Sequence, residues 1–360
     1  MNAHLYIGKQ DSDEMWDCSS IMTQASWYTS IVTGQAGKLN FTLVEDGTAC
    51  SPDFGNQVRL DVSGKTLFIG YIFTISEPSQ SGTREYLAYD QTRYLKNPAY
   101  YVFKNRTGSD IFRAVCADNG IKTGVIQECA FAREVHICDG KSGWEFLSEC
   151  IDDELTSKGN YFTFYDAVGK MTWVTLNSLR TDIMIGEESL LQDYTLSRSI
   201  DEDTFNNIIV HQENVEKIKV AGKKKKVKKT TTVDKVVSEI TATDIKDAKD
   251  NKTSVITKIM PSSFPKWGKL SMIETTQNLS EAEMKERGAM IFYLKNRPIV
   301  KLPLKCIGDI NLRAGNGIYV SLPKKNVKGD YVILSCTHNI VDDLHTMDLE
   351  IDSSGVYSGL

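Results

Sequence analysis

The chain has 360 residues, of which 41% are hydrophobic and 25% charged, and this length predicts two or three folded domains. Its formal net charge of -5 excludes a protein whose whole surface coats nucleic acid. No apolar run approaches the ~18 residues of a membrane span, and the opening MNAHLYIGKQ lacks the basic and apolar regions of a signal peptide. We therefore expect folding in a cytoplasm and no membrane anchor.

The first 100 residues predict strands. KLNFTLVED, from Lys38, and NQVRLDV, from Asn56, alternate apolar and polar residues, and a turn at SGK leads into TLFIGYIFTISE. Gly70 in that third run indicates a bulge or a close backbone approach. Strands at this spacing predict an antiparallel sheet or barrel.

Two helices and a hairpin follow, between residues 101 and 185. TGSDIFRAVCADNG predicts a helix capped by Ser109 or Asp110, and DGKSGWEFLSECIDDELTSKGN predicts one that begins at Ser142 and ends at Gly159. NYFTFYDAVGKMTWVTL predicts a hairpin that turns at residues 168–170. These elements predict a compact α+β module between β-rich flanks.

Strand-like runs resume at LLQDYTLSRSIDEDTFNNIIVHQ, and a polar insertion follows from about residue 213 to 255. NLSEAEMKERGAMIFYLKNRP predicts a third helix capped by Asn278 or Ser280. The chain then returns to strands in RPIVKLPLKCIG, GNGIYVSLP, GDYVILSCTHNI and HTMDLEI.

The insertion carries eight lysines and no acidic residue between Lys217 and Lys229, although the chain as a whole is acidic. The functional interpretation is contact with DNA or an acidic partner, and the simpler one is a solvated loop. Aromatic residues that would stack on bases are absent from the run. VEKIKV and KKKKVKK also suit a hairpin with Ala221-Gly222 at its tip. The candidate partner contacts are Lys223, Lys224, Lys225, Lys226, Lys228 and Lys229.

CTHNIVDDLHTMDLEI, residues 336–351, has the composition of a metal site. His338 and His345 nevertheless fall on two predicted strands, and Asp342 and Asp343 fall in the turn between them, where aspartates are good turn formers. Histidines on adjacent strands can bind zinc, but a catalytic site needs a third fixed ligand and an open position. We predict a structural hairpin and no metal.

No other pattern predicts catalysis or a cofactor. The acids of ECIDDEL (Glu149, Asp152, Asp153 and Glu154) are expected on the solvated side of a helix. No G-x-S-x-G elbow and no phosphate-binding loop occurs, and no C-x-x-C pair appears among the eight cysteines, which we expect to be reduced and mostly buried in cores. The sequence therefore predicts a protein that is not an enzyme.

The first and last β regions resemble each other. FGNQVRLDVSGKTLFIGYIFTIS begins at Phe54, and AGNGIYVSLPKKNVKGDYVILSCTH begins at Ala314. Gly55 matches Gly315, Asn56 matches Asn316 and Tyr71 matches Tyr331. Each stretch has Gly-Asn, an alternating strand, a polar turn, a glycine and then Tyr with another strand, which favours duplication of one barrel-like unit.

Several of these stretches carry a family resemblance, in this order: VRLDVSGKTLFIGYI, AYDQTRYLKN, DGKSGWEFLSECIDDELTSKGNYFTFYDAVGKMTWV, LSRSIDEDTFNNIIV, KWGKLSMIETT and IGDINLRAGNGIYVSL. In this ordered set the chain resembles the baseplate hub proteins of contractile phage tails and phage-tail-like bacteriocins, in the PBSX-type prophage branch, also called the late control protein D family. The lysine-rich insertion has no match.

The resemblance implies a mainly β fold with an α+β insertion and two tail-tube-like antiparallel β-barrel domains per subunit. The expected domains are a first barrel at 1–100, the insertion at 101–186, a second barrel at 187–212 and 256–360, and a lysine-rich hairpin at 213–255. The implied function is a structural hub that joins a hexameric tail tube to a trimeric spike. The alternatives are a tail-associated peptidoglycan hydrolase and a spike-hub relative of the secretion-system type.

The resemblance also implies partners and a location. The partners are two further copies in a homotrimer, the tail tube protein, the spike protein and the baseplate wedge proteins. The tape measure protein, DNA or nothing would pass through the channel, so nucleic acid enters only as a passenger. The implied location is the baseplate of a virion or phage-tail-like particle that is assembled in the bacterial cytoplasm.

Overall fold

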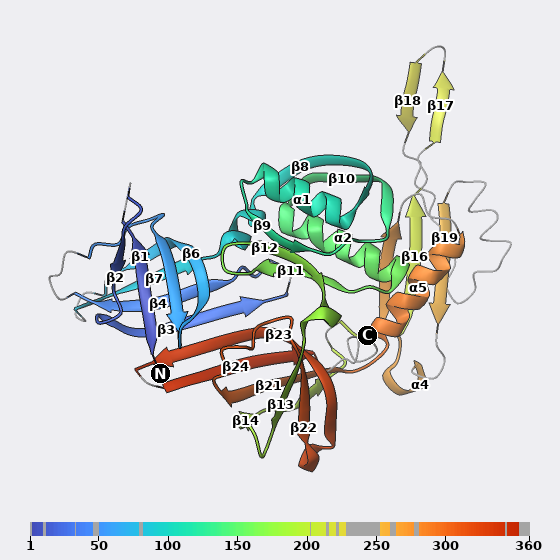
Figure 1. The fold of residues 1–360 in the computed structure, drawn as a ribbon. Coiled ribbons are helices and arrows are strands. Elements are labelled where there is room, and N and C mark those ends of the chain that lie inside the picture. Colours follow the sequence, from blue (N-terminus) through green and yellow to red (C-terminus); the bar gives the residue numbers. More distant parts are fainter. Residues whose placement is uncertain are drawn as a thin grey trace. The chain divides into compact units, whose positions relative to one another are not determined.

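The computed structural model describes residues 2–9, 12–32, 34–45, 50–78, 82–201, 203–213, 216–220, 223–227, 253–259, 264–276, 281–342 and 344–352. The chain forms two compact units (Figure 1). Unit 1 combines the chain up to Ser197 with the chain from Val300 onward, and unit 2 is Arg198–Ile299.

Unit 1 consists mainly of strands. They are β1 (Ala3–Gly8), β2 (Met15–Asp17), β3 (Met22–Ser30), β4 (Lys38–Val44), β5 (Gln57–Val62), β6 (Lys65–Ser76), β7 (Thr83–Tyr89), β8 (Pro98–Thr107), β9 (Thr123–Ile126), β10 (Ala132–Ser142), β11 (Phe162–Asp166), β12 (Met171–Thr175), β13 (Arg180–Gly186), β14 (Leu191–Tyr194), β15 (Ser197–Ser199) at the unit boundary, β21 (Ile299–Ile307), β22 (Gly317–Leu322), β23 (Val327–Val341) and β24 (Leu344–Asp352). The helices are α1 (Gly108–Asp118), α2 (Gly143–Lys158) and the 3-10 turns η1 (Gln91–Lys96), η2 (Leu176–Leu179) and η4 (Pro323–Lys325).

A 14-stranded sheet runs through unit 1, in the main order β14-β21-β24-β23-β3-β4-β7-β6-β5-β1-β2. The first β region, blue in Figure 1, and the last, red, are therefore joined edge to edge. The join is the antiparallel pair β3–β23, whose register runs from Ser335 opposite Ser30 to Val341 opposite Gln24. The prediction of a mainly β fold is confirmed, but the two β regions are halves of one sheet rather than two separate sheets.

The two halves share their strand order. β4-β7-β6-β5 in the first half corresponds to β21-β24-β23-β22 in the second, with antiparallel pairing throughout. The outer neighbours differ, because β1 is antiparallel to β5 whereas β13 is parallel to β22. The common order supports the duplication inferred from the internal repeat.

The repeated Gly-Asn pair forms the same turn in both halves. Gly55 N donates to Ile72 O at 2.9 Å, and Gly315 N donates to Ile333 O at 2.8 Å. The next residue accepts in both turns, Asn56 O from Ile72 N at 3.0 Å and Asn316 O from Ile333 N at 2.9 Å. Both glycines have positive φ, 78° and 92°, a region that glycine adopts at no steric cost.

Strand β23 serves two hydrophobic cores. Its residues Ile333 and Cys336 lie in the core of the second half, and Ile340 lies in the core of the first. A bulge between Ile333 and Ser335 leaves Leu334 out of register with β24. The Leu334 carbonyl instead accepts from Ile31 N at 3.0 Å, at the end of β3. With this bulge, one continuous strand contributes side chains to both cores.

The α+β module has its own core, formed by α1, α2 and the small sheets β8–β10 and β11-β12-β9. Helix α2 begins at Ser142 and ends at Gly159 in the left-handed conformation, as predicted. Helix α1 is capped one turn earlier than predicted, by Thr107, whose side chain accepts from Asp110 N while the Asp110 side chain accepts from Thr107 N. The prediction of Ser109 or Asp110 as the cap was wrong because Asp110 is the acidic partner in a capping box.

Unit 2 consists of β16 (Asn207–Glu213), β17 (Glu216–Val220), β18 (Lys223–Val227), β19 (Thr253–Ile259), β20 (Ser271–Thr276), α4 (Phe264–Trp267) and α5 (Glu281–Lys295). Its sheet order is β19-β16-β20, and α5 packs on it through Met284, Ile291 and Phe292 against Ile208 and Val210. The expected cap of this third helix lies outside the described residues.

The division corrects the expected second barrel. Residues 198–212 and 256–299 were placed in it by the sequence, but they belong to the compact unit 2. The reason is that α5 covers its own three-stranded sheet and gives these strands a separate core.

The two Gly-Asn turns predict a matched pair of mutational effects. An alanine in the left-handed region costs about 1–2 kcal/mol. A Cβ at Gly55 would meet no atom within 4 Å, whereas one at Gly315 would lie 3.0 Å from Leu179 Cδ1. We expect Gly55→Ala to lower the free energy of unfolding by about 1–2 kcal/mol and Gly315→Ala by more.

Urea unfolding of the two variants beside the wild type measures this difference. A neutral Gly55→Ala variant, or a Gly315→Ala variant that is the less destabilised of the two, would contradict the assignment.

Candidate functional site

The pair of histidines is the first candidate. His338 on β23 and His345 on β24 are both buried, and His338 Nδ1 lies 2.9 Å from His345 Nε2. The His338 ring stacks on Trp27 of β3, with ring centroids 4.9 Å apart. A side chain at Gly308 would collide with the His345 ring, because its Cβ would lie 2.2 Å from the ring carbon Cγ. The two rings are thus fixed by packing from three strands and a glycine.

The hydrogen bonds determine the protonation of both neutral rings. His338 Nε2 lies 2.8 Å from Leu312 O, a carbonyl that only accepts, so this nitrogen carries the proton. His338 Nδ1 is then an acceptor, and His345 Nε2 donates to it. His345 Nδ1 keeps an unprotonated lone pair that is buried and has no hydrogen-bond partner. Three of the four ring nitrogens are therefore engaged within the protein.

This arrangement is a poor metal site. Within the described part of the chain no group of three His, Cys, Asp or Glu side chains could hold a metal ion. Asp342 lies in the turn with a positive φ of 51°, and Asp343 is outside the described residues. Burial lowers the pKa of His338 to about 4 and also lowers the pKa of His345. Both rings are neutral at pH 7, and their role is to fill the sheet and bond to backbone.

The lowered pKa of His338 predicts a loss of stability in acid. A histidine with a folded pKa of about 4 and an ordinary pKa of 6.5 stabilises the fold fully above pH 6.5, and this contribution is lost as the pH falls toward 4. We expect the free energy of unfolding to fall by about 3 kcal/mol more over this range in the wild type than in His338→Gln.

Chemical denaturation at a series of pH values gives both slopes, each compared with the same variant at pH 7. His4→Gln is the control, since it removes a partly exposed histidine and should retain the wild-type slope. Parallel slopes for wild type and His338→Gln would refute the prediction.

A second buried polar cluster joins three parts of unit 1. Arg313, just before the second Gly-Asn turn, donates from Nη1 to Asp166 O of β11 at 3.0 Å. Its guanidinium lies 3.7 Å from the centroid of the Tyr165 ring, in a cation–π contact. Asp90, which follows β7, is also buried there, and a Cβ at Gly37 would lie 2.0 Å from Asp90 Oδ2. No local pattern in the sequence signals this cluster.

Burial shifts the pKa of each charged side chain in this cluster toward its neutral form. Desolvation raises the pKa of Asp90, and the neighbouring Asp166 raises it further. Desolvation also raises the pKa of Asp166 and lowers the pKa of Arg313. Asp90 and Asp166 also accept from backbone N–H groups of Thr92 and Gln91, so this cluster stabilises the fold rather than offering an open site.

The acids of helix α2 were predicted to be solvated, and for two of them this was wrong. Asp153 and Glu154 are buried. Asp153 is paired with Arg133 of β10, and Glu154 accepts from the backbone N–H groups of Ala130 and Phe131 at 3.1 and 2.8 Å. Glu149 and the exposed Asp152 do not share their environment. Glu154 thus satisfies backbone groups between β9 and β10, and Asp153 is held by the Arg133 ion pair.

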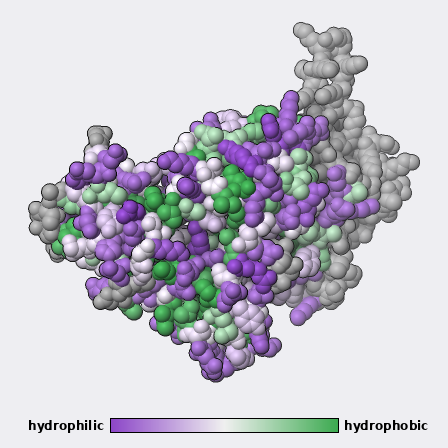
Figure 2. All heavy atoms as spheres, viewed as in Figure 1, coloured by the Kyte–Doolittle hydropathy of each residue, from purple (hydrophilic) through white to green (hydrophobic). Residues whose placement is uncertain are grey.

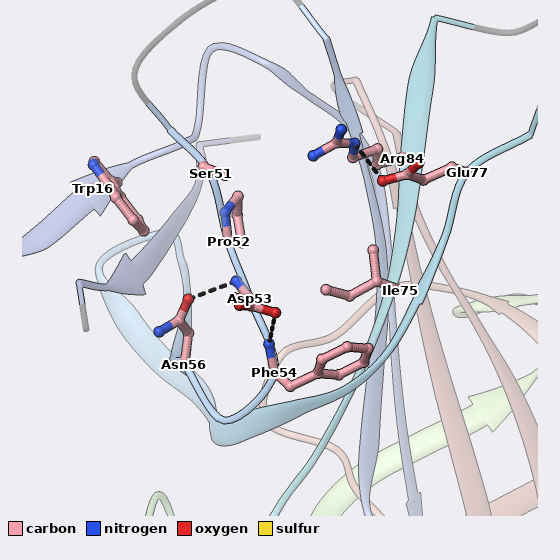
Figure 3. Close-up of a pocket in the computed structure, with 9 residues that line it drawn as sticks. All are labelled: Trp16, Ser51, Pro52, Asp53, Phe54, Asn56, Ile75, Glu77 and Arg84. Carbon is pink, nitrogen blue, oxygen red and sulfur yellow. Dashed lines mark hydrogen bonds and ion pairs between the residues drawn. The ribbon is translucent and has the colours of Figure 1, made fainter.

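A cavity of about 460 Å³ lies in the first half of the sheet (Figure 3). Its lining contains Trp16, Ser51, Pro52, Asp53, Phe54, Asn56, Ile75, Glu77 and Arg84. In Figure 3 Trp16 lies across the cavity from Arg84 and Glu77, while Phe54 and Ile75 supply apolar wall. Arg84 is paired with Glu77 at 3.1 Å and with Glu45. The cavity therefore has a mixed lining, with apolar side chains beside polar ones and the Arg84–Glu77 ion pair at one side.

The lysine-rich segment contains the predicted hairpin. β17 and β18 pair in antiparallel register, from Glu216 opposite Val227 to Val220 opposite Lys223. Four of the six candidate contact residues, Lys223 to Lys226, lie on β18. Lys228, Lys229 and the predicted tip at Ala221-Gly222 are outside the described residues.

Among the helices that the structure describes, none has both the length and the hydropathy to cross a membrane. On the face that Figure 2 shows, hydrophilic and hydrophobic residues are interspersed. The candidate functional features in the described part of the chain are the lysine-rich hairpin and the cavity of Figure 3.

Comparison with known proteins identifies the family of the chain. A family model described as YQBQ-like matches residues 25–232 and 224–352. The uncharacterized protein YqbQ of Bacillus subtilis (strain 168) is 25% identical over 306 residues, which are 82% of this chain and 81% of YqbQ. XkdQ, a protein of the phage-like element PBSX of the same organism, is 23% identical over 316 residues, covering 85% and 84%.

Two solved structures share the fold. The 43 kDa tail protein of prophage MuSo2 from Shewanella oneidensis has a TM-score of 0.67 at 13% identity and matches over 99% of both chains. The E. coli c3393 protein, a type VI secretion component described as similar to the bacteriophage T4 tail proteins gp27 and gp5, has a TM-score of 0.53 at 11% identity, over 98% of this chain and 78% of its own. The resemblance to phage tail proteins inferred from the sequence motifs is confirmed.

Proposed function

This chain belongs to the YqbQ-like family, and from that premise we propose that it is a structural protein of a phage-type tail baseplate, the central hub that joins a hexameric tail tube to a trimeric spike. The hub would be a homotrimer. Its neighbours would be the tail tube protein, the spike protein and the wedge proteins of the baseplate.

The observation that carries the proposal is the repeated strand order within unit 1. Each chain contains β4-β7-β6-β5 and the corresponding β21-β24-β23-β22. Three copies would present six similar half-sheets, which would match a sixfold tube on one side while the trimer would match a threefold spike on the other. A closed ring of this kind also avoids open-ended head-to-tail growth.

We propose that the protein has no catalytic activity. Polar side chains packed inside unit 1 support this proposal, because they already form hydrogen bonds to backbone groups. His338 bonds to Leu312 O, Glu154 to two backbone N–H groups, and Arg313 to Asp166 O. A second candidate, a spike-hub relative of the secretion-system type, is supported by the shared fold with c3393.

The symmetry of the assembled protein tests the hub proposal. We expect a mass of three chains in native mass spectrometry at micromolar concentration, and threefold symmetry with sixfold-like sheets in electron micrographs of the parent particle. The reason is that the six sheet halves must come in equal pairs from three chains. Six copies around the axis, or clearing of cell-wall material by the purified chain, would contradict the proposal.

The lysine-rich hairpin predicts a contact that depends on salt. We propose that β18 meets an acidic protein surface in the baseplate, since its four consecutive lysines oppose the acidic balance of the whole chain. Deleting residues 217–229 should leave the melting temperature of unit 1 unchanged but weaken assembly, with the deficit largest at low ionic strength and shrinking as added salt screens the contact in the wild type.

A variant with glutamine at Lys223–Lys226, Lys228 and Lys229 separates charge from shape. It should reproduce the deletion if charge carries the contact and behave as wild type if only the hairpin shape matters. Normal assembly of the deletion variant at every salt concentration would mean that the segment is a solvated loop.

A further inference from the structure

Two cysteines of the first half lie in thiol–thiol contact. Cys18 Sγ is 2.8 Å from Cys50 Sγ, although the residues are 32 positions apart in the chain. No disulfide joins the two residues in this structure. Neither the spacing of this pair nor its surroundings marked it in the sequence.

Cys18 is held rigidly. It follows β2, it is fully buried, and its N–H donates to Leu5 O at 2.9 Å. Its carbonyl accepts from Ile21 N at 3.2 Å and from Met22 N at 3.1 Å, which fixes the turn into β3. Contact with Cys50 and burial both raise the pKa of Cys18, so this sulfur is protonated at rest. Cys18 can therefore form a bond with Cys50, but its burial shields its thiol from reagents in solution.

Cys50 is the accessible member. It is half-buried, and it directly precedes Ser51 and Pro52, which line the cavity of Figure 3. A disulfide needs two cysteines whose side chains already face each other at close range, and this pair meets that requirement. The other end of the cavity wall, Phe54 and the Gly55 turn, is fixed by backbone bonds to β6. A disulfide between Cys50 and Cys18 would thus fix the end of the cavity wall that carries Ser51 and Pro52.

We propose that Cys18 and Cys50 are a disulfide-forming site that is oxidised by low-molecular-weight disulfides and that locks the wall of the cavity. The Cys50 thiolate attacks one sulfur of oxidised glutathione, forms a mixed disulfide and releases one glutathione thiolate. Cys18 then attacks Cys50 Sγ, the mixed disulfide breaks, and a second glutathione leaves. The two thiol protons pass to the two glutathione thiolates, so the reaction needs no other reactant.

The site does not depend on the proposed hub function. If the protein is a tail component, it forms in a reducing cytoplasm and works outside the cell, where disulfides persist. The cysteine pair would then stay reduced during assembly in the cytoplasm and become oxidised after release from the cell.

The test treats the reduced full-length protein with oxidised glutathione and counts thiols in denaturant. We expect the loss of two of the eight thiols. Peptide mapping by mass spectrometry should find the segments around Cys18 and Cys50 joined, with two hydrogen atoms lost. The closed loop should raise the melting temperature by about 5 °C, because the cross-link restricts the unfolded chain.

Two variants provide the controls. Cys50→Ser should keep its remaining thiols under the same treatment and show no rise in melting temperature, whereas Cys138→Ser should still lose two. The mapping of the wild-type protein decides the question even if a variant folds poorly. An unchanged thiol count, a lasting mixed disulfide at Cys50, or a cross-link between any other two cysteines would overturn the proposal.

Discussion

Unit 1 depends on the antiparallel pairing of β3 with β23. This ladder connects residues that are more than 300 positions apart and turns two similar half-sheets into one. Without it, β3 and β23 would each present an unpaired edge along the middle of the unit, and such edges favour association with other chains. Side-chain contacts reinforce the join, since Ser26 Oγ donates to Asn339 Oδ1 at 3.0 Å and Ala314 N donates to Thr29 Oγ1 at 3.0 Å.

The buried Arg313 cluster acts on the same join from the side of the α+β module. Its guanidinium contacts β11, while its backbone N–H donates to Asn316 Oδ1 in the second Gly-Asn turn at 2.8 Å. A buried charge that loses its partner is costly, so the module and the second half cannot separate without exposing or orphaning this group. The insertion is therefore part of the structural unit rather than an appendage.

Local signals in the sequence predicted local structure well. Ser142 and Gly159 bound a helix because a side-chain oxygen and a left-handed glycine satisfy its free backbone groups. The duplicated Gly-Asn turn was visible because its geometry demands the same residues twice. The hairpin strands of the lysine-rich segment followed from alternation and a turn-forming pair.

Long-range features were beyond such reasoning. No local pattern shows that β3 will pair with β23, because either edge of a half-sheet has the same alternation. The sequence predicted Asp153 and Glu154 to be solvated. Only the fold reveals that Asp153 pairs with Arg133 and that Glu154 accepts hydrogen bonds from the backbone at residues 130–131. The Cys18–Cys50 contact and the separate core of unit 2 depend in the same way on which distant segments meet. The candidate contact lysines were found from composition alone, and their partner is a property of the assembly.

The bulge at Leu334 has an evolutionary consequence. In a regular strand, residues with inward side chains are an even number of positions apart, yet Ile333 and Cys336 point into one core because the bulge inserts an extra residue between them. Losing Leu334 would only remove the bulge, but losing one residue from the regular stretch between Cys336 and Ile340 would reverse the inward and outward faces of everything beyond it. Insertions and deletions should therefore accumulate in the connections of this lineage, while the length of β23 between its two cores stays constant. Selection would act on that length because it decides which side chains face inward, whichever side chains these are.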